Sequence, residues 1–110
     1  MTEVELLVHV KKEGKLLLTP EWANLLKIIA KTGSLYAASK ETGVSYNKTW
    51  LIIDAMNSIN NKPLVIKLRG GKGGGGAVLT DFGKLIINEY DILETEVKKF
   101  AKKLNIEINI

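Results

Sequence analysis

Two short stretches of the chain carry side chains that suit chemistry with phosphates and nucleobases. In the first, GVSYNKTW, Ser45, Tyr46, Asn47 and Lys48 supply two hydroxyls, an amide and a cation. An asparagine amide can bond adenine through two hydrogen bonds, and lysine suits guanine or phosphate. At the start of a helix, residues of these types reach base edges and phosphates together.

The second stretch is a glycine run around one lysine, RGGKGGGGAVLT at residues 69–80. It contains G-x-G-x-x-G but leads into a strand-like AVLT, whereas a nucleotide-binding loop opens a helix, and Lys72 lacks the Ser or Thr that follows it in a P-loop. A domain linker is disfavoured because a single helix follows. The tip of a two-stranded hairpin remains, where Arg69 and Lys72 would meet phosphates or the minor groove. Without side chains, Gly73 and Gly74 would let the backbone approach DNA closely.

Charge supports a polyanionic partner. The 110 residues carry 16 Lys or Arg against 12 Asp or Glu, and residues 34–80 alone hold six against two. A positive excess beside the glycine run indicates a surface that faces a polyanion such as double-stranded DNA.

Other classes of protein find little support in the residue types. The chain has no cysteine and one histidine, His9, which falls on the polar face of an expected strand. We therefore expect no enzyme activity, no metal and no cofactor. No apolar run approaches the roughly 20 residues of a membrane span, and the N-terminus lacks the order of a signal peptide. We expect a cytoplasmic protein that does not contact a membrane.

The elements that must position these residues follow from capping residues and hydrophobic spacing. The expected fold class is mainly α with small β-hairpins, in a single domain over residues 1–110. Helix starts are predicted at four hydroxyl residues and helix ends at two glycines. These are Thr19, Ser34, Ser45 and Thr80, and Gly33 and Gly43. In chain order we expect a hairpin of strands 4–10 and 15–19, helices 20–32, 35–42 and 46–60, a hairpin of strands 62–69 and 77–80, and a helix over 81–104.

Residues 33–50 have the form of a helix-turn-helix. Ala37 and Ala38 are small enough for two helices to cross closely, Gly43 permits a left-handed turn, and Val44 would plug the core between the helices. With the glycine hairpin as a wing, the order of elements predicts a winged helix-turn-helix. An αα-hairpin with no role in nucleic-acid binding is the alternative. The residues expected to contact DNA are Ser34, Ser45, Tyr46, Asn47, Lys48, Arg69, Lys72, Gly73 and Gly74.

The third helix separates a buried face from an exposed one at about 100° per residue. The predicted core face consists of Thr49, Ile52, Ile53, Met56 and Ile59. Asn47, Leu51 and Asp54 lie opposite, and Tyr46, Lys48 and Trp50 lie near the margins. Trp50 has two open interpretations, which are packing in a core or interface and contact with DNA.

The last helix carries apolar residues at spacings of 4, 3, 4, 3 and 4. They are Ile86, Tyr90, Leu93, Val97, Phe100 and Leu104. This pattern, with charges around it, is typical of a coiled-coil seam. A helix of roughly 24 residues spans about 36 Å, longer than so small a domain needs, so its outer half is predicted to form a homodimer. Packing on its own domain alone is the alternative.

The stretch GSLYAASKETGVSYNKTWLIIDAMN, followed by PLV and GGKGGGGAVLTDFGKLII, resembles the DNA-binding domain of the ModE family of molybdate-responsive regulators. The resemblance covers about residues 30–95, and the layout is also similar to the DNA-binding heads of LysR-type regulators. It implies a winged helix-turn-helix that dimerises on double-stranded DNA and represses genes for molybdate or tungstate transport or for molybdoenzymes. By position, it places Ser45, Tyr46 and Lys48 in the recognition helix. It likewise places Arg69, Lys72 and the glycines in the wing.

One departure from that family concerns ligand control. Full-length members carry C-terminal molybdate-binding domains, whereas this sequence has 110 residues, so we expect no such domain and no tight binding of molybdate. Control by a separate molybdate-binding protein and the absence of ligand control both stay open. A LysR-like or architectural DNA-binding protein without a link to oxyanions, and a protein-interaction module on the same fold, are the alternative functions.

Overall fold

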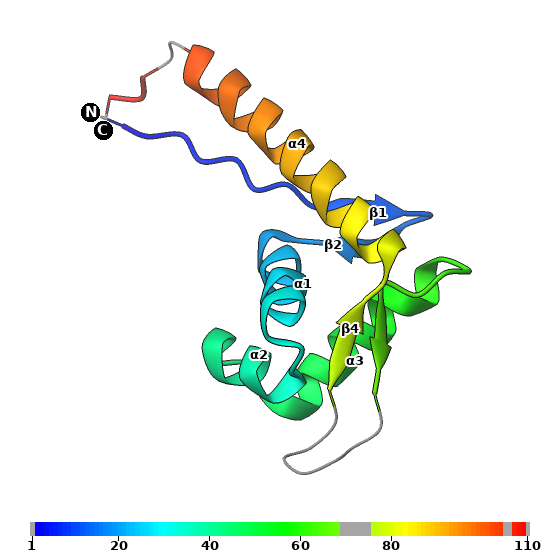
Figure 1. Cartoon of the computed structure of the whole chain (residues 1–110). Helices are drawn as coiled ribbons and strands as arrows, with labels where there is room; N and C mark the ends of the chain where they lie inside the picture. Colours follow the sequence, from blue (N-terminus) through cyan, green and yellow to red (C-terminus); the bar gives the residue numbers. More distant parts are fainter. Residues whose placement is uncertain (1, 69–75, 105–106, 110) are drawn as a thin grey trace.

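The structure is a computed structural model that describes residues 2–68, 76–104 and 107–109 (Figure 1). Helices dominate the described residues, as the sequence predicts, and each of the two small sheets is an antiparallel pair of strands. The elements in chain order are β1 (Val10–Lys12), β2 (Lys15–Leu18), α1 (Pro20–Thr32), α2 (Leu35–Thr42), α3 (Tyr46–Ile59), β3 (Val65–Lys67), β4 (Ala77–Leu79) and α4 (Asp81–Lys103).

The four predicted helix starts are confirmed, because each expected hydroxyl caps a helix by accepting a backbone hydrogen bond. The pairs are Thr19 with the N–H of Trp22 at 3.1 Å, Ser34 with Ala37 at 3.0 Å, Ser45 with Lys48 at 3.2 Å and Thr80 with Gly83 at 2.9 Å. Gly33 and Gly43 end α1 and α2 in the left-handed region, with φ of 67° and 75°. That conformation favours glycine because it has no Cβ.

The core forms around α1, most of whose apolar side chains are buried. The other helices and both hairpins add side chains to the same cluster. Its buried members are Leu17, Leu18, Ala23, Leu25, Leu26, Ile28, Ile29, Leu35, Ala38, Ile53, Met56, Leu64, Val65, Ala77, Leu79 and Tyr90. One continuous core of this kind fixes the helix-turn-helix, the wing strands and the start of α4 relative to one another.

The wing, which we define as β3, β4 and their connection, packs one face of its two strands against the helices. The register pairs Val65 with Leu79 and Lys67 with Ala77. Val65, Ala77 and Leu79 on the inner face are at most 5% exposed. Gly83 brings α4 against the chain before β3, because a Cβ at Gly83 would overlap the Leu64 carbonyl and lie 2.9 Å from the Leu79 side chain. Both wing strands are shorter than predicted.

The first hairpin forms as predicted, but its first strand is displaced. The expected strand over 4–10 is wrong, since β1 begins at Val10. The turn consists only of Glu13 and Gly14, both with positive φ, so Lys12 pairs directly with Lys15. Because β2 ends at Leu18, where the cap of α1 begins, β2 has no residues left to pair with the chain before Val10.

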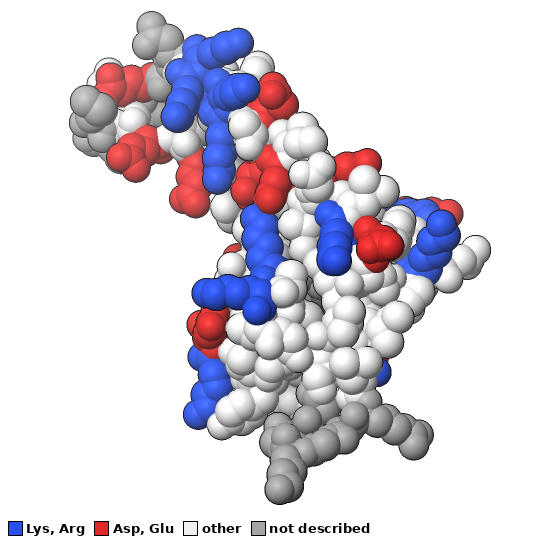
Figure 2. Space-filling model, in the orientation of Figure 1, with Lys and Arg blue, Asp and Glu red and all other residues white. Residues whose placement is uncertain are grey.

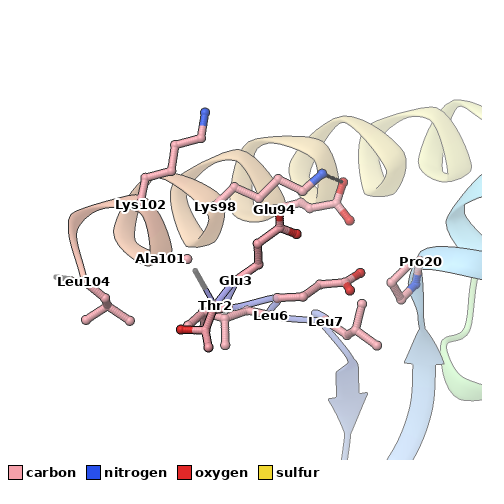
Figure 3. Close-up of a pocket in the computed structure, with 12 residues that line it drawn as sticks. Thr2, Glu3, Leu6, Leu7, Pro20, Glu94, Lys98, Ala101, Lys102 and Leu104 are labelled. Atoms are coloured by element: carbon pink, nitrogen blue, oxygen red, sulfur yellow. Dashed lines mark ion pairs between the residues drawn. The ribbon is translucent and has the colours of Figure 1, made fainter. Parts of the chain in front are cut away.

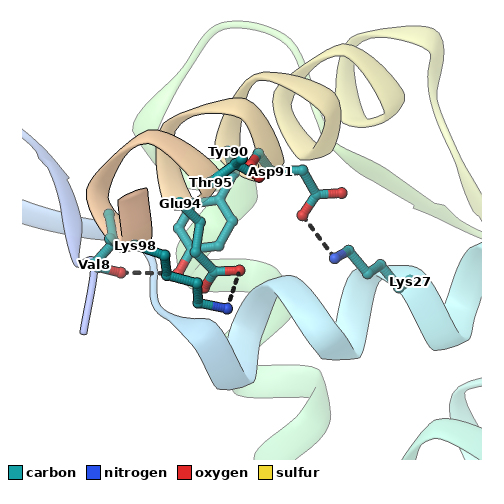
Figure 4. A network of polar contacts seen from close by, with 7 residues as sticks. All are labelled: Val8, Lys27, Tyr90, Asp91, Glu94, Thr95 and Lys98. Atoms are coloured by element: carbon teal, nitrogen blue, oxygen red, sulfur yellow. Dashed lines mark hydrogen bonds and ion pairs between the residues drawn. The ribbon is translucent and has the colours of Figure 1, made fainter. Parts of the chain in front are cut away.

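The segment before Val10 runs beside α4 instead and is bonded to Tyr90 of that helix. The Tyr90 hydroxyl donates to the Val8 carbonyl at 2.9 Å, and Lys27 on α1 pairs with Asp91 on α4 at 2.7 Å (Figure 4). Burial raises the pKa of the Tyr90 phenol to about 12, and the nearby Glu94 carboxylate adds to the shift. These contacts fix the inner half of α4, while its outer half extends beyond the helical body (Figure 1).

The chain end contributes no strand where it is described. The final stretch NIEINI alternates isoleucine with polar residues as an edge strand would, but residues 107–109 form no strand, and residues 105–106 and 110 lie outside the described residues. The backbone N–H of Ile108 donates to the Thr2 hydroxyl at 3.3 Å, so the two ends of the chain lie together.

Candidate nucleic-acid interface

The N-terminal turn of α3 presents polar side chains to solvent, with Asn47 on the predicted exposed face and Tyr46 and Lys48 near its predicted margins. Tyr46 is 38% exposed, and Asn47 and Lys48 are also exposed. On the opposite face Thr49, Ile53 and Met56 are completely buried. The helix therefore fixes which side chains point outward at its first turn.

The turn between α2 and α3 is built from the two alanines, the glycine and the valine that predicted it. Ala38 is completely buried, and Ala37 and Val44 are half-buried. The Ser39 hydroxyl donates to the Val44 carbonyl at 2.6 Å, which closes the turn after Gly43. This geometry sets α3 across α2 as in a helix-turn-helix.

The start of α2 lies against the base of the wing. The Ala77 N–H donates to the Gly33 carbonyl at 3.0 Å, and Ser34 forms a β-bridge with Gly76. A Cβ at Gly76 would lie 3.1 Å from the Gly33 carbonyl oxygen, so glycine permits this close approach. The predicted contact residue Ser34 thus stands beside β4, and the N-terminus of α2 offers N–H groups that favour an anion.

Four of the predicted contact residues lie outside the described residues. They are Arg69, Lys72, Gly73 and Gly74. The described base of the wing is closed by a hydrogen bond from the Leu68 N–H to the Gly76 carbonyl at 2.8 Å. The hairpin that the glycine run was predicted to join is therefore present in β3 and β4.

The outer face of the described part of the wing is apolar. Ile66 and Leu68 are each 49% exposed, and Val78, the cross-strand partner of Ile66, is 47% exposed. In Figure 2 the surface of the lower body in this view is largely uncharged, whereas Lys, Arg, Asp and Glu crowd the outer end of α4.

Trp50 packs within the domain, which favours one of its two interpretations. It is half-buried, and its ring meets Tyr46 edge-on at 6.2 Å between centroids and 72° between planes. The Lys67 ammonium on β3 lies 3.1 Å from the Trp50 ring centroid and 2.7 Å from the Asp54 carboxylate. One face of the indole is therefore covered by a side chain of the wing.

Sequence reasoning missed two residues that join α3 to the wing. Besides Lys67, Asn57 bonds the start of β3 through both ends of its amide. Its oxygen accepts from the N–H of Leu64 at 2.8 Å and of Val65 at 3.3 Å, and its nitrogen donates to the Val65 carbonyl at 2.9 Å. An asparagine on the core margin of a helix was the only available signal, and periodicity alone does not assign its partners.

The predicted seam on α4 divides into an inner and an outer part. Tyr90 is 3% exposed and Ile86 packs on the core, so these two residues serve this chain's own fold. Leu93, Phe100 and Leu104 are 44%, 59% and 37% exposed. The structure therefore leaves apolar side chains uncovered on the outer half, which is the part expected to meet a second copy.

A groove of about 590 Å³ lies between this outer half and the N-terminal segment (Figure 3). Its walls combine aliphatic side chains with charged ones, including Leu6 and Leu7 on one side and Lys98 and Lys102 on the other. Val4 and Leu7 line this groove together with Leu104, and they are 50% and 62% exposed.

Neither a metal cluster nor a membrane span is found where the structure describes the chain. No three His, Asp or Glu side chains among residues 2–68, 76–104 and 107–109 gather where they could hold a metal ion. Within the same residues, no helix combines the length and apolar character needed to cross a membrane.

Several known proteins are similar in sequence to this chain. The DNA-binding transcriptional dual regulator ModE of Escherichia coli K12 is 43% identical over 91 residues, which are 83% of this chain and 35% of that protein. Transcriptional regulator ModE of Haemophilus influenzae is 38% identical over 94 residues, covering 86% of this chain and 37% of that protein. Molybdenum-pterin-binding protein MopB of Rhodobacter capsulatus is 44% identical over 87 residues, covering 76% and 32% respectively.

The chain thus spans about a third of the length of these relatives. No family model matches it. The identity nevertheless extends over more than four-fifths of this chain in both ModE proteins, and the described fold is a winged helix-turn-helix. Over the part that aligns, this chain matches the N-terminal DNA-binding portion of ModE transcriptional regulators.

Proposed function

We propose that this chain is a sequence-specific, double-stranded-DNA-binding transcriptional regulator of the ModE type. The observation that carries the proposal is the first turn of α3, where Tyr46, Asn47 and Lys48 are exposed, in a domain whose wing lies against the start of α2. A helix presented in this way fits the major groove, where amide and ammonium groups discriminate between bases. The names of the ModE relatives support the same role.

The two parts of the interface have different tasks in this proposal. Asn47 and Tyr46 read base edges, Ser34, Ser45 and Lys48 add hydroxyl and ammonium contacts, and Arg69 and Lys72 with the wing glycines meet the DNA backbone. The target genes are those for molybdate or tungstate transport or for molybdoenzymes, which the chain represses in the cytoplasm. Ligand control, where it exists, comes from a molybdate-binding protein. The chain acts without enzymatic chemistry of its own.

The outer half of α4 makes the chain a homodimer in this proposal. Leu93, Val97, Phe100 and Leu104 of two copies bury one another, and the N-terminal segment adds Val4 and Leu7 to the same surface. Apolar stripes of this length on an exposed helix are typical of interaction sites. A dimer would present two α3 helices to two half-sites on one duplex.

Two substitutions test the division of tasks. Asn47→Ala should weaken binding to the preferred duplex by about 1–3 kcal/mol and leave binding to random duplex nearly unchanged. Lys72→Ala should weaken binding to both duplexes about equally, since phosphate contacts carry no sequence information. Fluorescence anisotropy with both duplexes measures each affinity. A change in the preferred sequence on Lys72→Ala, or equal losses on Asn47→Ala, would contradict the assignment.

A further inference from the structure

We propose that Lys67 is a positioning residue for DNA recognition, which fixes the wing against α3 and sets the ring of Tyr46. The inference rests on the proposed DNA binding and deepens it, because it names a residue that acts through others. The residues involved are Lys67 on β3 and Asp54, Trp50 and Tyr46 on α3.

The position of Lys67 in the wing is the first argument. It lies on the inner face of β3, in register with the buried Ala77, where its neighbours Val65 and Leu79 are apolar. The side chain of a lysine at this position must extend until its ammonium reaches an interaction partner, because an unpaired buried ammonium is costly. Its side chain is only 20% exposed.

Two contacts satisfy this lysine, and both come from the recognition helix. The ammonium stands 3.1 Å from the centroid of Trp50 and 2.7 Å from the carboxylate of Asp54. A cation over an indole face within about 6 Å is attracted by the ring quadrupole, and the carboxylate neutralises its charge. Lys67 is thus engaged by the protein itself and is not counted among the phosphate contacts.

These contacts complete a two-point attachment of β3 to α3. Asn57 bonds Val65 at the first residue of the strand, and Lys67 reaches Trp50 and Asp54 from the last. A strand of three residues held at both ends has little freedom to tilt away from the helix. The base of the wing is therefore held at one distance from the first turn of α3.

The same cluster reaches the DNA-reading surface through aromatic packing. Trp50, covered on one face by Lys67, meets Tyr46 edge-on at 6.2 Å. Tyr46 is 38% exposed at the start of α3 and belongs to the proposed base-reading set. Removal of the Lys67 ammonium would allow the Trp50 ring to move, and the Tyr46 ring, which packs against it, would move as well.

The salt dependence of DNA binding separates positioning from direct phosphate contact. Lys67→Met keeps an aliphatic side chain over the indole but removes the charge. We expect it to lower affinity for the preferred duplex about tenfold, while the slope of log K against log salt stays as in wild type. The same phosphates are contacted once the complex has formed, so the number of released counterions is unchanged. A slope shallower by about 0.9 per chain, or about 1.8 per dimer, would show a phosphate contact and overturn the proposal.

The control for this slope is Lys48→Met, which removes an exposed cation of α3 from the proposed DNA surface. It should make the slope shallower by about 0.9 per chain. Lys67→Arg retains a cation for the indole and the carboxylate, and should keep affinity within about twofold of wild type. Far-ultraviolet circular dichroism checks that each variant is folded. An affinity of Lys67→Arg as low as that of Lys67→Met would contradict the proposal.

A measurement without DNA distinguishes failure of this proposal from failure of DNA binding. With 5-fluorotryptophan, Trp22 and Trp50 give two fluorine resonances, which Trp50→Phe assigns. Lys67→Met should shift the Trp50 resonance and leave that of Trp22 in place, because only Trp50 contacts the ammonium. An unchanged Trp50 resonance would overturn the positioning role even where DNA binding holds. Failure of the wild type to bind any duplex would overturn the proposed function. The fluorine resonance of Trp50 would still test the contact between Lys67 and Trp50.

Discussion

Asn57→Ala should lower the free energy of unfolding by about 2–4 kcal/mol, because it removes the partner of backbone groups that are shut off from water. Asn57 makes two short hydrogen bonds, one from the Leu64 N–H at 2.8 Å and one to the Val65 carbonyl at 2.9 Å, and a longer one from the Val65 N–H at 3.3 Å. Leu64 and Val65 are 0% and 1% exposed. Leaving a buried donor or acceptor unpaired costs about 1–3 kcal/mol, and about 1–2 kcal/mol for each of the two short bonds, toward the lower end of that range, gives the expected sum.

Thermal unfolding followed by circular dichroism measures this loss. At about 4 °C per kcal/mol for a domain of this size, Tm should fall by roughly 8–16 °C. Asn47→Ala is the matched control, since it removes the same amide from the exposed face of the same helix and should shift Tm by less than about 2 °C. Equal Tm values for Asn57→Ala and wild type would refute the idea that this amide joins α3 to the wing.

Three other perturbations test separate parts of the structure. Gly83→Ala should destabilise the chain by about 2–3 kcal/mol in urea unfolding, because the new Cβ overlaps the Leu64 carbonyl. Unfolding of this variant at the wild-type urea concentration would mean that α4 does not pack against Leu64. The pKa of Tyr90 is raised to about 12 in the folded chain, whereas it is near 10 in the unfolded chain. The neutral phenol therefore stabilises the fold fully below about pH 10, and this contribution is lost as pH rises to about 12. In urea unfolding at a series of pH values, the stability advantage of wild type over Tyr90→Phe should shrink across this window. A constant advantage would exclude the buried phenol. Leu93→Glu with Val97→Glu should convert a dimer to a monomer in sedimentation and weaken operator binding, whereas a wild-type monomer at micromolar concentration would refute the dimer.

Local signals in the sequence were sufficient for the helices. Hydroxyl caps and the glycines Gly33 and Gly43 act within one turn of the chain, so the bounds of α1, α2 and α3 could be predicted to within a residue. Helical periodicity likewise predicted that Asn47 is exposed, but it placed Tyr46 and Lys48 only near the margins of the core face.

Tertiary contacts decided what the sequence could not show. Alternation over residues 4–10 indicated a strand, but the chain before Val10 has no partner because β2 ends at the cap of α1. Tyr90 fits a coiled-coil spacing, yet its hydroxyl finds the Val8 carbonyl in the same chain. Lys67 looked like one more cation of a basic region, and only its register on β3 places it over Trp50.

Sequence-specific recognition of duplex DNA is the central claim, and one competition experiment tests it most directly. A labelled duplex, chosen by selection from a random pool with the wild-type chain, is displaced by itself, by a shuffled duplex and by its separate strands at one salt concentration. The selected duplex should compete at least about 10³-fold better than the shuffled duplex, and the single strands should compete no better than the shuffled duplex. Equal competition by all of them would contradict base reading by α3.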